Sequence, residues 1–313
     1  MEGTVSAERT VQRVSLEEEV RALAERERLN EALHDYCALR KKAAMSVESA
    51  ETRQEKVWRE RVTDWFYKVV DRVELERDMV YVAMNMLDRF LAVIEDTESY
   101  LRDQKKYRLA AMTCLLLSLK MCGSNAIGLG SLVKMSSGSV TQDQVLHCAK
   151  TIVRSLSWTR PLATPAAFLA KLSHILPSHS RQSVLHHATF LVELSLYDPF
   201  FQAASPSDIA IAALLNAQSI THTTRAQAKH FLTSATSLTS HTNLSNLLRL
   251  RKRLNTAFLR ASPASDHTNN PSIPTTIHTI PSVPTIHTIE CRVVSSDDMT
   301  ASQPSSKRRK IAP

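Results

Sequence analysis

Glycine is scarce in this chain of 313 residues, which has only five, and no proline precedes Pro161. So few glycines argue against folds built on glycine turns, such as β-sandwiches, and against glycine-rich phosphate loops. A long stretch without proline leaves helices uninterrupted. The composition therefore favours an all-α protein before any motif is considered.

Long apolar runs and paired cysteines are also missing. The longest apolar stretch, residues 109–119, is much shorter than the ~20 residues that a membrane-spanning helix needs, so it predicts a buried core helix. The five cysteines are an odd number without Cys-x-x-Cys spacing, which is typical of reduced thiols in an intracellular protein. The charged beginning, from Glu2 on, predicts no signal peptide. We expect no membrane partner.

Catalytic and metal-binding patterns are absent as well. His186 and His187 are adjacent, so they point to different parts of a helix surface, and no His-x-x-x-His or cysteine pair supports them. The sequence contains neither a phosphate loop nor a kinase signature. We therefore predict a non-catalytic protein with no cofactor, no metal site and no small-molecule substrate.

Four regions follow one another along the chain. Residues 1–51 contain a charged helix over 15–46, which Ser15 and Glu18 would open as a capping box and which we expect to be a solvated surface helix. Two successive sets of about five helices follow, and the chain ends in a Ser/Thr/Pro-rich tail. The first helical set covers 52–160, the second 161–261 and the tail 262–313.

Periodicity and capping patterns support the two helical sets. From Trp58 to Val73 the apolar residues recur on one face of a helix. Thr141 with Gln144 forms a capping box, and Thr164 followed by Pro165 is an N-cap with proline at the first helical position. The repeated unit suggests a duplicated α domain.

The tail has a composition of its own. It has no aromatic residue and contains seven of the twelve prolines, and TIHTI occurs twice, at 276–280 and 285–289. Such a segment cannot bury enough apolar surface to offset chain entropy, so we predict disorder. The basic run near its end is typical of a nuclear import signal and consists of Lys307, Arg308, Arg309 and Lys310.

Several segments resemble the cyclin box. WRERVTDWFYKVV (58–70) and MVYVAMNMLDRFLAV (79–93) contain the Arg, the Asp-Trp and the Leu-Asp-Arg-Phe-Leu of that family. YRLAAMTCLLLSLK (107–120) resembles the third helix of the box, and QVLHCAKTIVRSLSW (144–158) the fifth. FLVELSLYDPFFQAASPSDIAIAALLNA (190–217) is similar to the C-terminal cyclin box.

This resemblance, over roughly 52–258, implies tandem five-helix boxes preceded by an N-terminal helix. It also implies a regulatory subunit that binds and activates a cyclin-dependent protein kinase in cell-cycle control. Substrates or inhibitors of that kinase would be further partners. The expected location is the nucleus, with shuttling to the cytoplasm left open.

The resemblance assigns roles to individual residues. Arg59 and Asp88 match a buried ion pair that holds the box together, and finding both partners is more informative than finding one. Lys120 matches a lysine that hydrogen-bonds backbone carbonyls of the kinase. The other residues that match the kinase-binding surface are apolar: Leu117, Met121, Val153 and Trp158.

Two departures from the family pattern matter. The glutamate that pairs with the family's lysine falls on Ala149, and Cys122 and Gly123 replace the acidic pair after the lysine. The groove that receives an Arg-x-Leu motif in cell-cycle cyclins is also altered, because Lys68 takes an acidic position and Arg61 an apolar one. We therefore predict poor binding of Arg-x-Leu substrates. The matching residues are Trp58, Arg61, Val62, Trp65, Lys68, Tyr107 and Arg108.

Two alternatives stay open. The missing carboxylate at Ala149 favours a cyclin-box scaffold that works without a kinase. A basic segment, which includes Arg249, Arg251, Lys252 and Arg253, favours a transcription-related cyclin-like factor. A net charge of +8 permits such a role, but the sequence has no N-terminal zinc ribbon, and we consider nucleic acid an unlikely partner.

Overall fold

The computed structural model describes residues 2–28, 50–124, 126–136, 138–156, 162–239 and 243–261, with side chains from 14 and 54 onward in the first two ranges. Within these residues the chain forms twelve α-helices, two short 3₁₀ helices and no strand, which confirms the all-α prediction. The predicted tail, with Lys307 to Lys310, lies outside the described residues, and so does Trp158.

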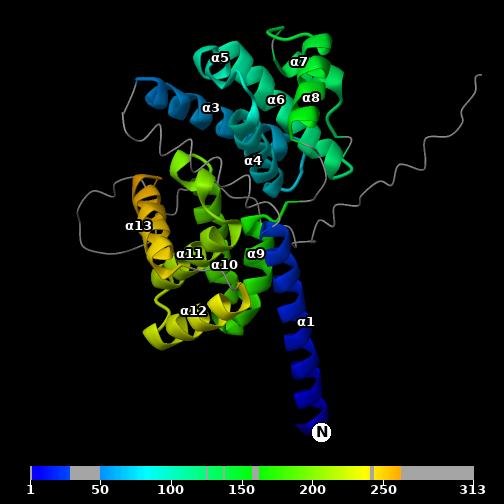
Figure 1. Ribbon diagram of the computed structural model, residues 1–313. Coiled ribbons are helices and arrows are strands. Elements are labelled where there is room, and N and C mark those ends of the chain that lie inside the picture. Colours follow the sequence, from blue (N-terminus) through cyan, green and yellow to red (C-terminus); the bar gives the residue numbers. More distant parts are fainter. Residues whose placement is uncertain are drawn as a thin grey trace, which may run out of the picture.

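The first helical set packs around two central helices. α4 and α6 have most of their residues buried, and they pack against each other (Figure 1). The shorter helices and α3 and α8 surround them. The bounds are α3 Ala50–Arg72, α4 Asp78–Val93, α5 Thr97–Arg102, α6 Gln104–Met121, α7 Leu129–Met135 and α8 Gln142–Ser155.

Local sequence explains where these helices begin. The Asp103 carboxylate accepts the backbone N–H of Lys105 at 2.8 Å and so caps α6. Thr141 and Gln144 form the predicted capping box at the start of α8, with both reciprocal hydrogen bonds present. The apolar run 109–119 lies inside α6, which confirms the prediction of a core helix.

The second set surrounds a single central helix. In α11, thirteen consecutive residues from Pro206 to Gln218 are buried, and α11 contacts every other α-helix of its set. The bounds are α9 Pro165–Leu172, η1 Ser173–Ile175, α10 Ser178–Ser195, η2 Pro199–Ala203, α11 Pro206–Ile220, α12 Arg225–Thr239 and α13 Leu244–Ala261. As predicted, Thr164 caps α9, where its hydroxyl accepts the N–H of Ala167 at 3.1 Å.

The N-terminal helix differs from its prediction. α1 covers Glu2–Arg28, so Ser15 lies inside the helix and does not open it. The predicted capping box is wrong because Ser-x-x-Glu also occurs inside helices, and only the preceding backbone decides whether it caps. The rest of the predicted helix, residues 29–46, lies outside the described residues.

The expectation of a solvated surface helix also fails for α1. Val20 is fully buried and Leu23 nearly so, both in the core of the second set. The Glu27 carboxylate accepts the backbone N–H of Ser207 at 2.7 Å, at the start of α11. Val20, Leu23 and Glu27 are three and four residues apart, so they form one stripe on the helix that packs against α9, α11 and α12.

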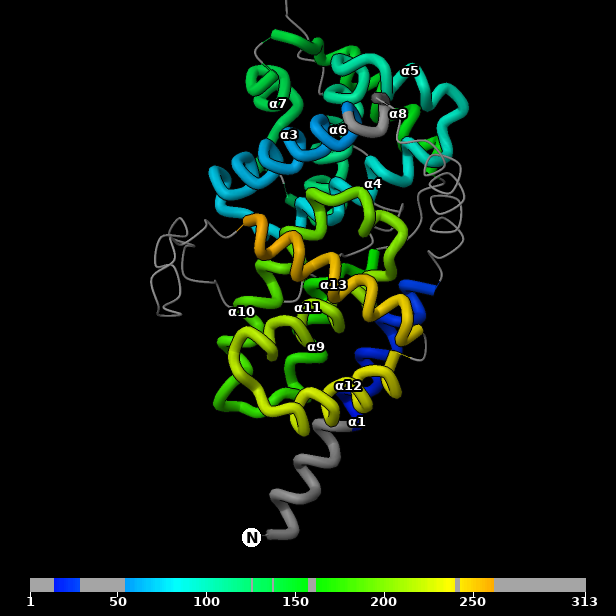
Figure 2. The backbone as a smooth tube through the Cα atoms, turned by 90° about the vertical axis from the view of Figure 1, so that its left-hand side faces the viewer, coloured from blue at the N-terminus to red at the C-terminus, as the bar shows by residue number. Residues whose placement is uncertain are grey.

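The two sets lie one above the other. Figure 1 shows α3 to α8 above α9 to α13, with α1 alongside the lower set, and Figure 2 shows the same order from the side. Each set has its own apolar core, and the cores share no residue. The first core also includes Leu196 of the second set, and Leu162 and Tyr197 pack against it, so the junction combines apolar and polar contacts.

Candidate functional site

A buried ion pair ties the two helical sets together. The Arg59 guanidinium on α3 binds Asp88 on α4 with both terminal nitrogens, at 2.5 and 3.0 Å. Arg59 Nε also donates to the carbonyl of Leu196 at 2.7 Å, and Gln202 donates to Asp88 at 2.8 Å. The side chains of Arg59 and Asp88 are 3% and 12% exposed. Burial is tolerable because each charge has several partners, which fits the predicted structural role.

A second group of polar contacts crosses the same junction. Arg77 Nε lies 3.1 Å from Glu193 Oε1, and the Arg77 guanidinium lies over the ring of Tyr67 at 4.5 Å. Tyr67 stacks on Tyr197, whose hydroxyl donates to Asp64 at 2.8 Å. The first set thus holds the second by charge and hydrogen bonding beside its own apolar core.

Two carboxyl groups at this junction have pKa values above the ordinary range for their residue type. Burial raises the pKa of Glu193 to about 7, although Arg77 acts in the opposite direction. Burial likewise raises the pKa of Asp78 to about 6, although the Thr164 hydroxyl donates to it at 2.7 Å. The junction therefore holds carboxyls that bind protons more readily than in the unfolded chain.

Four of the five residues predicted to meet a kinase lie at the C-terminal end of α6 and on α8, and the fifth, Trp158, lies outside the described residues. Lys120 is exposed in the last turn of α6, while Leu117 and Met121 are partly buried and pack on the core. The three share one face of α6, since they lie three and four residues apart. Val153 is 39% exposed on α8, which packs against α6. The structure thus places these residues on adjoining helices, and their role in binding stays a prediction.

The departures from the family pattern are also visible here. Ala149 is partly buried on α8, and the nearest carboxylate on that helix, Asp143, is exposed in its first turn. Gly123 follows α6 with a φ of +71°, a conformation that favours glycine over an acidic residue. The backbone that ends α6 is therefore suited to the residues present.

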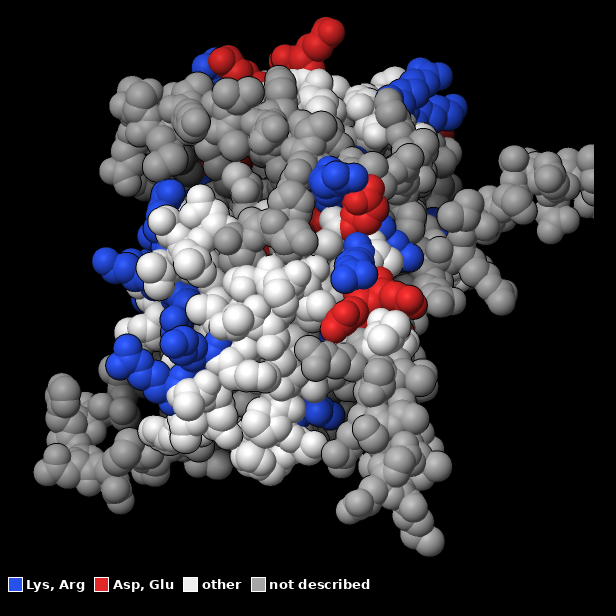
Figure 3. Space-filling view, turned by 60° about the horizontal axis from the view of Figure 1, so that its bottom comes forward, with Lys and Arg blue, Asp and Glu red and all other residues white. Residues whose placement is uncertain are grey.

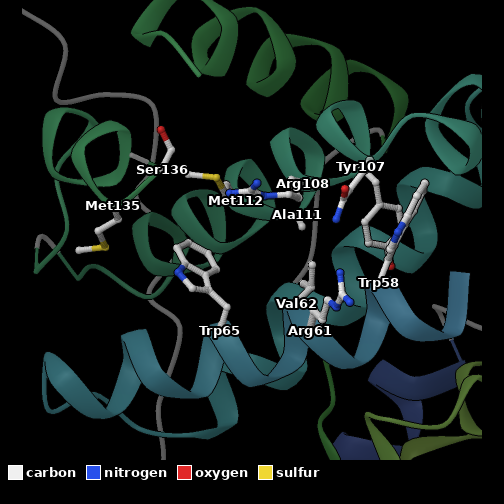
Figure 4. A pocket seen from close by; sticks show the side chains of 11 residues that line it. Trp58, Arg61, Val62, Trp65, Tyr107, Arg108, Ala111, Met112, Met135 and Ser136 are labelled. Atoms are coloured by element: carbon white, nitrogen blue, oxygen red, sulfur yellow. The ribbon is translucent and has the colours of Figure 1, made fainter. Parts of the chain in front are cut away.

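A pocket of about 310 Å³ lies beside α3 and α6. Figure 4 shows Trp65 and Met135 at one end, Trp58 with Tyr107 at the other, and Arg61 and Arg108 between them. Its lining residues are Trp58, Arg61, Val62, Trp65, Gln104, Tyr107, Arg108, Ala111, Met112, Met135 and Ser136.

The pocket brings together six of the seven residues of the predicted docking patch, all but Lys68, which is exposed one turn beyond Trp65 on α3. The Trp58 and Tyr107 rings lie 5.6 Å apart between centroids and are nearly fully buried. The sequence prediction missed the other five lining residues, because proximity between helices leaves no local pattern in the sequence: Gln104, Ala111, Met112, Met135 and Ser136.

The basic segment on α13 makes contacts within the chain. Arg253 Nε donates to Asp198 at 2.5 Å, and Arg251 Nε donates to Asn216 at 3.1 Å. Arg249 lies 5.8 Å from the centroid of the Phe200 ring. Lys and Arg side chains do gather along the edge where α13 lies, at the left of Figure 3. Three of the four basic residues nevertheless have partners in this chain, which weakens the case for a nucleic-acid surface.

The described residues give little support for metal, membrane or thiol chemistry. Among the residues that the structure describes, no three His, Cys, Asp or Glu side chains gather as a metal site would require. In the same part of the chain, no helix is long and apolar enough to cross a membrane. Burial raises the pKa of the Cys114 and Cys148 thiols, which disfavours the reactive thiolate.

Comparison with known proteins identifies two domains in this chain. The model of the N-terminal cyclin domain matches residues 30–159, and that of the C-terminal cyclin domain matches residues 163–272. The chain is 29% identical over 157 residues to G2/mitotic-specific cyclin-1 of Medicago sativa subsp. varia, covering 50% of this chain and 35% of that protein. It is 30% identical over 159 residues to cyclin-B2-2 of Arabidopsis thaliana, covering 51% and 35%.

The aligned part of this chain spans about a third of the length of these relatives. Among solved structures, a viral cyclin from herpesvirus saimiri matches with a TM-score of 0.49 and 19% identity, over 65% of this chain and 86% of that one. A chain of the CAK complex from Chaetomium thermophilum matches with a TM-score of 0.43 and 14% identity, over 80% and 93%. Because the two domain models cover most of the sequence in the expected order, this chain belongs to the cyclin family.

Proposed function

We propose that this cyclin binds and activates a cyclin-dependent protein kinase in cell-cycle control. Cyclins are regulatory, non-catalytic subunits, and the relatives reported above carry mitotic or B-type cyclin names. The observation that carries the proposal is the end of α6, where exposed Lys120 lies on the same helix face as the partly buried Leu117 and Met121. A charged group beside apolar anchors is suited to a specific and durable interface.

Activation would follow from differential binding. A cyclin that binds the active arrangement of its kinase better than the inactive one shifts the population toward the active state. In this proposal the Lys120 ammonium donates hydrogen bonds to kinase backbone carbonyls, while Leu117 and Met121 pack against the kinase. No step requires a catalytic group in this chain.

Affinity purification from cells of the source organism tests the proposal. Tagged wild-type chain, Lys120→Ala and Trp158→Ala are compared for co-purified kinase and for histone phosphorylation. Lys134→Ala is the matched control, since Lys134 is an exposed lysine in the last turn of another helix of the same box, α7. We expect kinase with the wild type and the control, and less with the other two. Absence of kinase from all four would contradict the proposal.

A kinase-independent scaffold is the second candidate, and Ala149 is the observation that favours it. Without a carboxylate on α8 near Lys120, one charge-assisted hydrogen bond to a kinase is lost, which corresponds to about 1.5–3 kcal/mol. Ala149→Glu separates the two candidates. If the chain is a kinase regulator, the variant should capture about tenfold more kinase than the wild type at limiting concentration. A scaffold would capture none in either form.

We also propose that the basic run Lys307 to Lys310 directs the protein to the nucleus. A fluorescent fusion in which all four residues are alanine should lose nuclear enrichment. Alanine at Arg249 and Lys252 is the control, since it removes positive charge from a folded helix. Equal nuclear signal from both variants would contradict this part.

A further inference from the structure

The pocket beside α3 and α6 has positive charge and no negative charge in its lining. Trp58, Tyr107 and Met112 are buried apolar or aromatic residues, whereas Arg61 and Arg108 are exposed. Lys68 adds a third exposed cation on α3 beyond Trp65. An apolar floor with a cationic rim recognises a ligand that carries both an apolar side chain and an anionic group.

These three cations lack ion-pair partners in the part of the chain that the structure describes, where no carboxylate lies within 4.0 Å of Arg61, Arg108 or Lys68. Two carboxylates close to these cations in the sequence, Asp64 on α3 and Asp103 before α6, serve other contacts. Asp64 accepts the Tyr197 hydroxyl, and Asp103 accepts the N–H of Lys105. By contrast, Arg59, on the same helix as Arg61, is fully engaged with Asp88.

We propose that this pocket binds a short segment of a partner protein in which an Asp or Glu lies within a few residues of Leu or Phe. The apolar side chain enters between Trp58 and Trp65 and packs on Met112, and the carboxylate binds Arg61 or Arg108. A guanidinium can bind a carboxylate through two parallel hydrogen bonds, so each arginine offers both charge and direction. Met112 and Met135 are flexible and polarizable, which lets the pocket accept Leu and Phe alike.

The same charges exclude the opposite ligand. A peptide with arginine next to its apolar residue would place one guanidinium against Arg61 and Arg108, which is repulsive. The inference rests on the proposed function in one respect, because the segment would belong to a substrate or inhibitor of the kinase complex. Binding itself requires only this chain, so the two claims can be separated.

A peptide array probed with the 313-residue chain tests the proposal. The array holds Leu-Phe fixed and moves a single Glu, Gln or Arg through the flanking positions. At least one Glu peptide should bind, and fluorescence anisotropy should show it about tenfold tighter than its Arg counterpart, with Gln between them. The difference should shrink between roughly 0.05 and 0.5 M salt, because exposed charges are screened.

Charge reversal provides the decisive variant. Arg61→Glu with Arg108→Glu should invert the preference, so that the Arg peptide binds better than the Glu peptide. Arg72→Glu is the matched control, because Arg72 is an exposed arginine on the same helix that does not line the pocket. The Arg72→Glu variant should still bind the Glu peptide better than the Arg peptide. Trp58→Ala should weaken both peptides, and circular dichroism checks that each variant is folded.

Three results would overturn the inference: no peptide binds, Arg peptides bind the wild type as well as Glu peptides do, or reversal leaves the order unchanged. A dimer detected by light scattering whose association competes with peptide would assign the pocket to a second copy and also overturn it. Kinase capture is measured on the same preparations. Peptide binding without kinase capture contradicts the proposed function alone, and the reverse result contradicts this inference alone.

Discussion

The central helices of the two cyclin boxes differ in how completely they are buried. In the second box α11 is enclosed, with every residue from Pro206 to Gln218 buried and α1 covering its N-terminal end. In the first box α6 is buried along its middle, but Arg108 near its start and Lys120 near its end are exposed. The two candidate binding surfaces therefore lie at opposite ends of one helix in the first box.

The two boxes also contribute different groups to the junction between them. Contacts from the first box are made by charged and hydrogen-bonding groups, namely Arg59, Arg77 and Asp88, which are met by Glu193 and Gln202 from the second. Apolar contact across the junction is limited to Leu196, which joins the first core, and to Leu162 and Tyr197, which pack against that core. A junction of this kind depends on matched partners, so removing one partner is expected to be costly.

The largest effect is expected from Asp88→Ala. It leaves the buried Arg59 without its carboxylate and Gln202 without its acceptor, so the free energy of unfolding should fall by about 3–5 kcal/mol. Urea denaturation followed by circular dichroism measures it. Glu98→Ala is the control, because Glu98 is an exposed member of a surface ion pair with Arg102. A loss no larger than that of the control would refute the role given to the ion pair.

A smaller effect should follow from placing a larger side chain in the core around α11. Ala213 on α11 is fully buried, and Ala213→Leu should lower the free energy of unfolding by about 1–3 kcal/mol because the surrounding core has no room for the larger side chain. Ala226→Leu, at an exposed position on α12, should be nearly neutral. Thermal melting of both variants compares them. Equal melting temperatures would show that α11 is less enclosed than described.

Glu27→Ala tests the contribution of α1. The change leaves the buried N–H of Ser207 without its acceptor and removes a negative charge from the N-terminus of α11, at a cost of about 1–2 kcal/mol. Glu18→Ala, exposed on the same helix, should cost much less. Hydrogen exchange should show faster exchange at the start of α11 for Glu27→Ala only. Unchanged exchange there would mean that α1 does not cap α11.

The smallest effect concerns pH. Because the pKa of Glu193 is raised to about 7 in the folded protein, the folded state binds an extra proton between roughly pH 4.5 and 7. Its stabilising contribution is complete below that range and is lost as the pH rises through 7. Glu193→Gln removes this titration, so it should flatten the decline in stability between pH 5 and 8. Denaturation at several pH values measures both curves, and parallel curves would contradict the assignment.

Much of the fold could be predicted because the sequence patterns that specify its helices each involve residues close together in the chain. The periodicity from Trp58 onward, the capping box at Thr141 and the proline at Pro165 each act within a few residues, and each predicted helix was found. The Arg59–Asp88 pair required the family pattern, since the two residues lie 29 positions apart. For the pocket, the same pattern gave six lining residues but could not show that Met135 and Ser136 close one end.

The predictions failed where residues outside the recognised pattern decide the outcome. Ser15 fits a capping box, yet the helix continues through it, and nothing in residues 1–51 reveals that Glu27 caps α11. The basic residues of α13 resemble a binding surface until Asp198 and Asn216 are found beside them. Local composition describes what a segment can do, and long-range partners decide which of these possibilities is used.

The hydrogen bond between Glu27 and Ser207 also sets an order of events during synthesis. The two residues are 180 positions apart, and ribosomes add about 5–20 residues per second. After its synthesis, α1 thus waits on the order of ten to forty seconds before the helix it caps exists. During that time Val20 and Leu23 have no core to enter, so the nascent chain exposes an apolar stripe that chaperones can recognise until the second box is complete.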